Sequence, residues 1–301
     1  MKTLTYLSTL VFSMTFFSCE NVPEIAPEQT RSAMAIMLTA ATPTGYNVAK
    51  NQAYGTSPSQ VYDVYTPILS PEDIVKKSVS VVMVHGGGWS LLDKSFLDRV
   101  VEDFKKQNLN LTIFNINHRL PLSDNVTFKN IMEDFNLFFE HQQSLKTSLN
   151  LADEVFLWGY SSGGHLALTY SYKYQKPYIK AVAAVAAPTD LTKTSINQGI
   201  IFQGDRNLTE ILIGSTFENN PEAYKEASPI FKANRRSVRT ILFYGGQDEL
   251  VDDEEQGKTL YNKLTEINVE ADLRVLPEAT HEMTGQMDGI VNTTMKFVQN
   301  L

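Results

Sequence analysis

The segment from Val155 to Ala167 reads VFLWGYSSGGHLA and combines a strand, a turn and the start of a helix. Its apolar beginning, Val155–Trp158, predicts a buried strand, and a helical pattern starts at His165. Glycines flank the turn between them, which is the context of a G-x-S-x-G elbow. Small flanking residues leave room for the strained backbone of such a turn. We therefore expect Ser161 at the tip of the turn, although a glycine-rich surface turn can carry the same letters by chance.

Apolar runs typical of strands alternate with helical patterns along the chain. The predicted strands are Val61–Tyr65, Val79–Val84, Leu111–Ile116, Val155–Trp158, Ile179–Ala187, Thr240–Tyr244 and Ala271–Leu276. The predicted helices are Phe96–Phe104, Ile131–Phe139, the helix from His165, Leu208–Ile213, Glu254–Ile267 and Asp288–Phe297. This alternation predicts an α/β fold with a mostly parallel central sheet flanked by helices. The alternating polarity of Val61–Tyr65, which Pro67 ends, predicts an edge strand.

Right-handed crossovers bring the carboxyl ends of parallel strands to one edge of the sheet, where sites of α/β proteins lie. The glycine-rich or polar turns that we expect at that edge follow Val84, Trp158, Tyr244 and Leu276. The functional site is therefore predicted there.

The first 18 residues contain Lys2, a short apolar run and a small residue at the end, which is typical of a secretory signal peptide. Cys19, the only cysteine of the chain, follows directly. The segment resembles a bacterial lipoprotein signal, in which Cys19 becomes the acylated first residue. We expect export and a lipid anchor in a bacterial membrane, facing the periplasm or the cell exterior. The alternative is an ordinary cleaved signal with an incidental cysteine.

The chain of 301 residues is long enough for one large domain, expected at 46–301. Residues 19–45 are rich in Pro, Glu, Ala and Thr and predict a tether. The segment 191–239 breaks the alternation of strands and helices, and we interpret it as an inserted cap or lid. The net charge of −8, without a basic run, argues against nucleic acid as a partner.

A serine hydroxyl is a weak nucleophile unless a base takes its proton. Among five histidines, only His281 follows the last predicted strand, and the other four are expected to be solvated or core imidazoles. A carboxylate must orient the base, and Asp248 lies just after the strand Thr240–Tyr244. Asp252, Asp253, Glu254 and Glu255 are rivals, but they are typical of the acidic first turn of a helix. We therefore predict Ser161, Asp248 and His281 as the catalytic residues.

A tetrahedral intermediate needs backbone N–H donors around its oxyanion. The loop His85-Gly86-Gly87-Gly88 offers such groups without side chains in the way, and Ser162 offers another at a helix N-terminus. We predict an oxyanion hole formed by Gly87, Gly88 and Ser162. His85 is expected to brace the loop. Trp89 and Tyr160 are candidates for substrate contact, with Trp89 as a pocket wall or a core residue.

These motifs together resemble the α/β-hydrolase esterases with an HGGG loop, which include the carboxylesterase and hormone-sensitive-lipase-like groups. The residues that carry the resemblance are HGGGW at 85–89, GYSSG at 159–163, Asp248, His281, YDVYTP at 62–67 and ASPI at 227–230. The similarity spans about 54–281. Two positions depart from the pattern: Gly245-Gly246-Gln247 precedes Asp248 in place of the commoner His-Gly, and His118 replaces a tyrosine, which should change only the packing.

The resemblance implies an α/β-hydrolase fold and hydrolysis of carboxylic esters through an acyl-Ser161 intermediate, without metal or cofactor. The expected location favours short-acyl or carbohydrate-linked esters, such as acetyl or feruloyl esters of polysaccharides. Two alternatives stay open at this point. One is an amidase, peptidase or formamidase of the same fold, and the other is a surface binding protein without catalysis.

Overall fold

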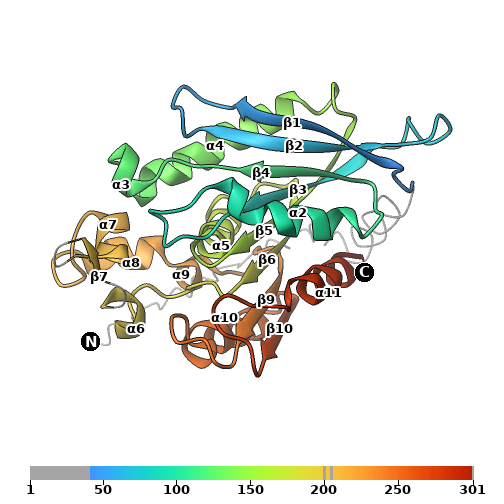
Figure 1. The fold of residues 1–301 in the computed structure, drawn as a ribbon. Coiled ribbons are helices and arrows are strands. Elements are labelled where there is room, and N and C mark those ends of the chain that lie inside the picture. The colour runs from blue at the N-terminus through green and yellow to red at the C-terminus, as the bar shows by residue number, and fades with distance from the viewer. Residues whose placement is uncertain (1–40, 199–200, 204–205, 300–301) are drawn as a thin grey trace, which may run out of the picture.

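The computed structural model describes residues 41–198, 201–203 and 206–299. They form an eight-stranded sheet with the strand order β1-β2-β4-β3-β5-β6-β9-β10 (Figure 1). Its strands are β1 Gly45–Ala53, β2 Val61–Ile68, β3 Ser78–Val84, β4 Leu111–Ile116, β5 Leu151–Tyr160, β6 Ile179–Val185, β9 Arg239–Gly245 and β10 Ala271–Leu276. The predicted signal peptide, Cys19 and most of the predicted tether lie outside the described residues.

The sheet is mostly parallel, as predicted. Only β1 and β2 introduce antiparallel pairing, β1 with β2 and β2 with β4, while the pairs from β4 through β3, β5, β6 and β9 to β10 are parallel. The strands β4 and β10 have the predicted bounds. Because β3, β5, β6, β9 and β10 run in the same direction, the loops that follow them emerge at one edge of the sheet.

The prediction that Val61–Tyr65 forms an edge strand is wrong. These residues belong to β2, and β1, which lacks an apolar pattern, covers their outer side. The polar residue that creates the alternation, Asp63, is buried with Lys50 Nζ and Lys94 Nζ at 2.9 and 3.1 Å from its oxygens. It also accepts a hydrogen bond from the Asn51 N–H at 2.8 Å. The polar position therefore marks a paired internal charge and not an exposed face.

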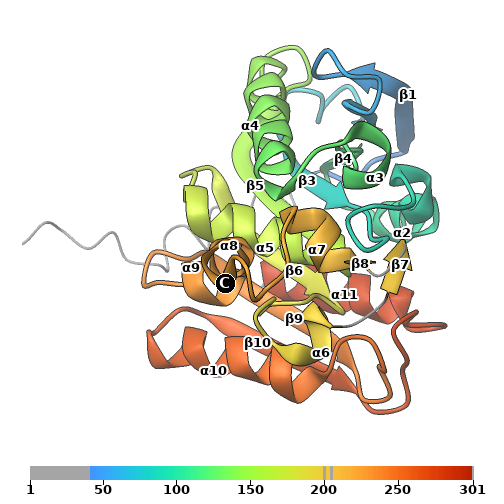
Figure 2. The same cartoon turned by 90° about the vertical axis from the view of Figure 1, so that its left-hand side faces the viewer.

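Helices cover both faces of the sheet and create two apolar cores. One core contains side chains of α4 (Phe128–Ser144), α5 (Ser162–Tyr174) and α10 (Thr259–Glu266). The other contains side chains of α2 (Asp98–Lys105) and α11 (Met287–Gln299). In Figure 2, α4 and α5 lie to one side of the strands and α2 to the other. Shorter elements are η1 Lys94–Leu97, α3 Pro121–Asp124 and the π-helix η2 Asp253–Lys258.

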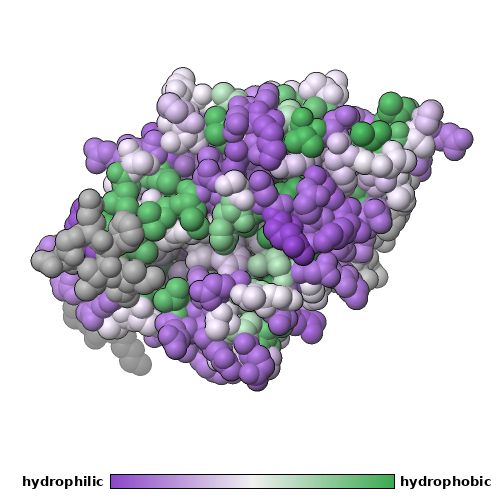
Figure 3. Space-filling model, viewed as in Figure 1, coloured by the Kyte–Doolittle hydropathy of each residue, from purple (hydrophilic) through white to green (hydrophobic). Residues whose placement is uncertain are grey.

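The segment between β6 and β9 consists of short elements that gather at one end of the sheet (Figure 1). They are α6 Thr194–Asn197, β7 Ile201–Gln203, β8 Arg206–Asn207, α7 Leu208–Ile213, α8 Pro221–Ala227 and α9 Pro229–Lys232. The helix α7 has the predicted bounds and begins with a capping box between Asn207 and Glu210. On the face in Figure 3, hydrophobic surface gathers at the end of the sheet where α3 lies, and hydrophilic surface covers α2. Within the described ranges, no helix is long and apolar enough to cross a membrane.

Glycines allow α5 to begin directly against the ends of β3 and β5. A Cβ on Gly159 would lie 2.4 Å from the carbonyl oxygen of Gly163. A Cβ on Gly163 would lie 2.2 Å from the Val84 oxygen and 2.3 Å from the His85 oxygen. All of these neighbours are backbone atoms, which cannot move aside without shifting a strand or loop. The elbow motif thus sets the distance between Ser161 and the loop after β3.

We predict that Gly163→Ala lowers the free energy of unfolding by about 3 kcal/mol or more, because the added methyl overlaps backbone. Gly289→Ala is the matched control, since a Cβ at this position in α11 meets nothing within 4 Å. The control is expected to be neutral or to stabilise the protein by up to about 1 kcal/mol. Urea unfolding of both variants measures the difference. Equal effects of the two substitutions would contradict this account of the elbow.

Candidate active site

Ser161 lies between the end of β5 and the first residue of α5, with φ 51° and ψ −122°. A positive φ is strained for a residue with a side chain and persists only where its surroundings hold it. Here the Ser161 N–H donates to the Val185 carbonyl at 2.7 Å, and the Ser161 carbonyl accepts from the His165 N–H at 3.0 Å. The strained turn that the sequence predicts at Ser161 is therefore present and is fixed on both sides.

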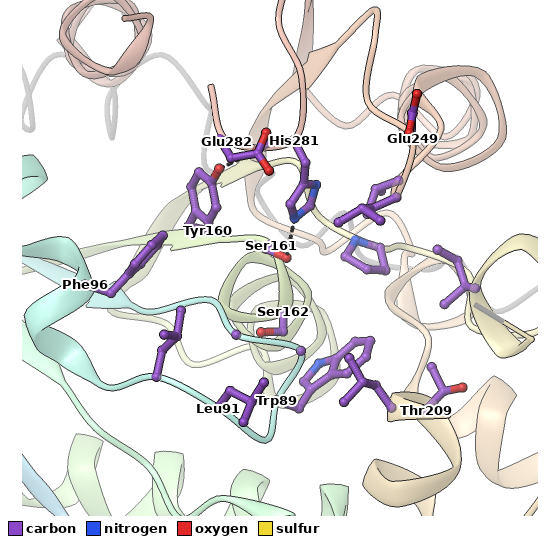
Figure 4. A pocket seen from close by; sticks show the side chains of 18 of the residues that line it. Trp89, Leu91, Phe96, Tyr160, Ser161, Ser162, Thr209, Glu249, His281 and Glu282 are labelled. Carbon is purple, nitrogen blue, oxygen red and sulfur yellow. Dashed lines mark hydrogen bonds between the residues drawn. The ribbon is translucent and has the colours of Figure 1, made fainter. Parts of the chain in front are cut away.

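His281 joins the other two predicted catalytic residues, which are far apart in the sequence. Its Nε2 lies 2.9 Å from Ser161 Oγ, and its Nδ1 lies 2.8 Å from Asp248 Oδ2. Figure 4 shows the imidazole of His281 directed at the Ser161 hydroxyl. Because the carboxylate accepts from Nδ1–H, Nε2 is left with the lone pair that can accept the serine proton.

Asp248 has a full set of partners for a buried carboxylate. Its Oδ1 accepts from the N–H groups of Leu250 and Val251 at 2.8 and 2.9 Å, which leaves Oδ2 for the imidazole. The side chain of Asp248 is 0% exposed, whereas that of His281 is 15% exposed. Asp252, the nearest rival, instead caps η2 by accepting from the Glu255 N–H at 2.7 Å. Asp253, Glu254 and Glu255 form the acidic first turn of η2, as the sequence suggests.

The loops that carry Asp248 and His281 are tied to each other through backbone bonds. The Gly246 N–H donates to the Leu276 carbonyl at 2.8 Å, and the Gln247 N–H donates to the Ala279 carbonyl at 3.0 Å. A Cβ on Gly245 would lie only 2.2 Å from the Ala279 oxygen. The unusual Gly-Gly-Gln lead-in therefore permits the close approach of the acid loop to the base loop.

Tyr160 holds the base loop from the other side. Its hydroxyl donates to the backbone carbonyl of His281, and its ring lies edge-on to the imidazole with centroids 6.0 Å apart. Phe96 packs against the same ring at 5.4 Å. The predicted substrate contact of Tyr160 is compatible with this position, because the residue lines the cavity at Ser161. The hydrogen bond between Tyr160 and the His281 carbonyl could not be predicted from the sequence, because the two residues are 121 positions apart.

The predicted oxyanion donors Gly87, Gly88 and Ser162 line the same cavity as Ser161. Gly87 and Gly88 have φ of 109° and 58°, values that disfavour side chains. The Gly87 carbonyl accepts from the Ser90 and Leu91 N–H groups at 3.2 and 2.9 Å, so the loop folds back on itself. Ser162 is the first residue of α5, and the first N–H groups of a helix have no partner within it.

The cavity at Ser161 has a volume of about 790 Å³, which is typical of a site for a small molecule. Its lining is mostly apolar. The lining residues are Gly87, Gly88, Trp89, Leu91, Leu92, Phe96, Tyr160, Ser161, Ser162, Pro188, Ser195, Ile196, Leu208, Thr209, Glu249, Leu250, Val251, His281 and Glu282. Trp89 is thus both a cavity wall, as Figure 4 shows, and nearly buried.

Several of these lining residues were not predicted. Four of them belong to the segment 191–239, whose sequence has too little periodicity to orient its side chains: Ser195, Ile196, Leu208 and Thr209. Glu249 and Glu282 are each adjacent in sequence to a predicted catalytic residue, which is the one signal that could have found them. In the described part of the chain, no three His, Cys, Asp or Glu side chains gather to hold a metal ion.

The other four histidines have partners elsewhere. His85 stacks on His118 with centroids 4.9 Å apart, and their Nδ1 atoms bond the carbonyls of Gly86 and Arg119 at 2.8 and 2.9 Å. His141 bonds the Tyr62 hydroxyl, and His165 bonds Trp89 and Ala227. Burial, together with the neighbouring His118, lowers the pKa of His85 to about 3. Burial also lowers the pKa of His118 to about 4.

A family model described as BD-FAE matches residues 63–264, more than half of the chain. The chain belongs to the BD-FAE family. No curated protein matches its sequence. The BD-FAE match runs from within β2 to within α10 and therefore includes Ser161 and Asp248, whereas His281 lies beyond it.

Solved esterase structures share the fold of this BD-FAE member. A truncated carbohydrate esterase from gut microbiota has a TM-score of 0.74 and 17% identity, over 86% of this chain and 98% of that one. An inhibited esterase B from Lactobacillus rhamnosis has a TM-score of 0.67 and 15% identity, over 91% and 92%. An acetyl ester-xyloside bifunctional hydrolase from Caldicellulosiruptor lactoaceticus has a TM-score of 0.66 and 15% identity, over 86% and 97%. The predicted α/β-hydrolase fold is thus confirmed.

The two stacked histidines predict loss of stability in acid. The pKa of an unfolded imidazole is about 6.5, above the folded values of about 3 and about 4, so the unfolded chain binds more protons as the pH falls. The stability that both neutral rings contribute is complete above pH ~6.5 and is lost toward pH ~4. We expect His118→Tyr to reduce the slope of unfolding free energy with pH in this window by about 1.4 kcal/mol per unit. Urea unfolding measures both slopes, and parallel curves for the two proteins would contradict the assignment.

Proposed function

We propose that this protein is a serine esterase that hydrolyses carboxylic esters through an acyl-Ser161 intermediate. The observation that supports this most strongly is the continuous hydrogen-bonded line from Asp248 through His281 to Ser161. The structural neighbours, which include a carbohydrate esterase and an acetyl ester-xyloside bifunctional hydrolase, agree with this chemistry.

In the proposed reaction, Ser161 Oγ attacks the ester carbonyl carbon while His281 Nε2 takes the hydroxyl proton. The carboxylate of Asp248 stabilises the imidazolium that forms. The carbonyl oxygen becomes an oxyanion, for which the backbone N–H groups of Gly87, Gly88 and Ser162 are the proposed donors. The C–O bond to the alcohol then breaks, and the alcohol leaves with the proton from Nε2. Water, deprotonated by the same imidazole, attacks the acyl-enzyme and releases the acid and the free serine.

We propose short-acyl or carbohydrate-linked esters, such as acetyl and feruloyl esters, as the substrates. A cavity of about 790 Å³ with mainly apolar walls suits a small acyl group together with part of its alcohol. We further propose that the segment 191–239 acts as a cap, because Ser195, Ile196, Leu208 and Thr209 contribute one side of this cavity.

A fluorophosphonate probe is expected to label the wild-type protein, whereas Ser161→Ala is not labelled. The same substitution should lower kcat for p-nitrophenyl acetate by roughly 10⁵–10⁶-fold, since it removes the nucleophile. Ser171→Ala is the matched control, because this buried hydroxyl in the same helix bonds only the Ala167 carbonyl among the contacts seen in the described residues. Labelling of Ser161→Ala at the wild-type rate would overturn the mechanism. A wild-type protein that neither reacts with the probe nor hydrolyses esters would instead favour a binding protein without catalysis.

The size of the acyl group is tested by comparing kcat/KM for acetyl, feruloyl and palmitoyl esters of one alcohol. We expect the acetyl or the feruloyl ester to exceed the palmitoyl ester by at least about tenfold, because a long flexible chain loses more conformational freedom on binding than a short or an aromatic acyl group. Solubility is controlled by measuring below the critical micelle concentration of the palmitoyl ester. Hydrolysis of the long-chain ester alone would overturn the proposed substrate class.

A further inference from the structure

His165 is a fully buried imidazole that the proposed reaction does not use. His165 lies on α5 one turn after Ser161, and its backbone N–H donates to the Ser161 carbonyl at 3.0 Å. Burial lowers the pKa of His165 to about 3, so the ring is neutral in ordinary conditions. A neutral imidazole has one N–H donor and one acceptor nitrogen, and the neighbours of His165 determine which is which.

Trp89 and Ala227 fix the state of the ring. The Trp89 Nε1–H donates to His165 Nδ1 at 3.0 Å, and since an indole N–H can only donate, Nδ1 must be the acceptor. The proton therefore lies on Nε2, which donates to the Ala227 carbonyl at 2.9 Å. The indole also lies edge-on to the imidazole, with centroids 5.3 Å apart and planes at 84°. His165 thus links the loop after β3 to the end of α8, from within the helix that directly follows Ser161.

The indole that His165 binds belongs to a strained loop residue. Trp89 has φ 63°, in a region that a bulky side chain seldom occupies, and it directly follows Gly87 and Gly88. Such a conformation costs on the order of 1–3 kcal/mol and has to be held by its surroundings. Leu208 of α7 packs beside the preceding residue, Gly88, where an added Cβ would lie 2.4 Å from its Cδ1. The loop backbone is therefore held by the hydrogen-bonded indole of Trp89 and by an apolar contact at Gly88.

We propose that His165 is a positioning residue that holds the backbone of Gly87 and Gly88 in place through the Trp89 indole. Through Ala227, the same imidazole makes the position of this loop depend on the segment 191–239. The inference rests on the proposed function, because it assigns Gly87 and Gly88 to the oxyanion hole. It adds a residue that touches no substrate and yet governs how well the oxyanion is bound.

His165→Phe keeps a ring of similar size and removes both hydrogen bonds. We expect kcat for p-nitrophenyl acetate to fall by roughly tenfold or more, because a small displacement of oxyanion donors weakens transition-state binding. KM should stay within about twofold, and the inhibition constant of a boronic acid that forms a tetrahedral adduct should rise as kcat falls. Trp89→Phe removes the same hydrogen bond from the other side. The double variant should lose little more kcat than either single variant, since both act through one contact.

Phe128→Leu is the matched control for lost packing. Phe128 lies edge-on to the His165 ring at 6.0 Å, outside the hydrogen bonds to Trp89 and Ala227. The Phe128→Leu substitution should lower the free energy of unfolding and leave kcat within about twofold of the wild-type value. Equal kcat and boronate affinity in His165→Phe and Phe128→Leu would overturn the inference. If His165→Phe does not fold, Trp89→Phe alone decides, because unchanged boronate affinity in that variant contradicts the positioning role.

A spectroscopic measurement separates this inference from the proposed function. The chain has only two tryptophans, so ¹⁵N labelling of the indoles gives two N–H signals, and Trp89→Phe identifies the one from Trp89. In His165→Phe, this signal should move upfield and exchange with solvent faster, while that of Trp158 stays unchanged. An unchanged Trp89 signal would contradict the hydrogen bond between His165 and Trp89, even in an active esterase. A protein that shows the link but does not hydrolyse esters refutes the proposed function and not the contact.

Discussion

The site depends on one constraint: the imidazole of His281 has to be hydrogen-bonded at both nitrogens. The arrangement of the strands and loops around the site meets this requirement. Asp248 binds Nδ1 and Ser161 lies at Nε2, although the three residues come from loops after β9, β10 and β5. Parallel strands deliver these loops to one edge of the sheet, which is the general reason for sites at this place in α/β folds. The Tyr160 hydroxyl then fixes the base loop to the strand that carries the nucleophile. Without these restraints, Ser161, His281 and Asp248 would not be held within hydrogen-bonding distance of one another.

Close backbone contacts set the precision of the arrangement. At Gly159, Gly163 and Gly245, an added Cβ would lie less than 2.5 Å from a backbone oxygen that packs against the glycine. Side-chain flexibility cannot relieve such contacts, so the elbow, the loop after β3 and the base loop have little freedom relative to one another. Positive φ values at Ser161 and Trp89 show where this packing imposes strain on residues with side chains. Both of these residues lie at the site, where a rigid arrangement of donors is of most use.

Much of the fold could be predicted from the sequence, because buried parallel strands are continuous apolar runs and the elbow is a local signal. The bounds of β4, β10 and α7 agree with their apolar patterns. The strand β1 was not predicted because most of its side chains are exposed and show no apolar pattern. The burial of Asp63 in β2 was not predicted because it depends on lysines from two other segments. Contacts such as Tyr160 with His281, or His165 with Trp89, join residues 121 and 76 positions apart, and no local pattern encodes them.

The most direct test of the account is a crystal structure of the protein after reaction with a phosphonate ester. We predict a covalent bond between phosphorus and Ser161 Oγ, with His281 still bonded to Asp248. The phosphonyl oxygen should lie within hydrogen-bonding distance of backbone N–H groups of Gly87, Gly88 and Ser162, since it occupies the place of the oxyanion. An adduct on another residue, or a phosphonyl oxygen turned to solvent away from these donors, would contradict the account.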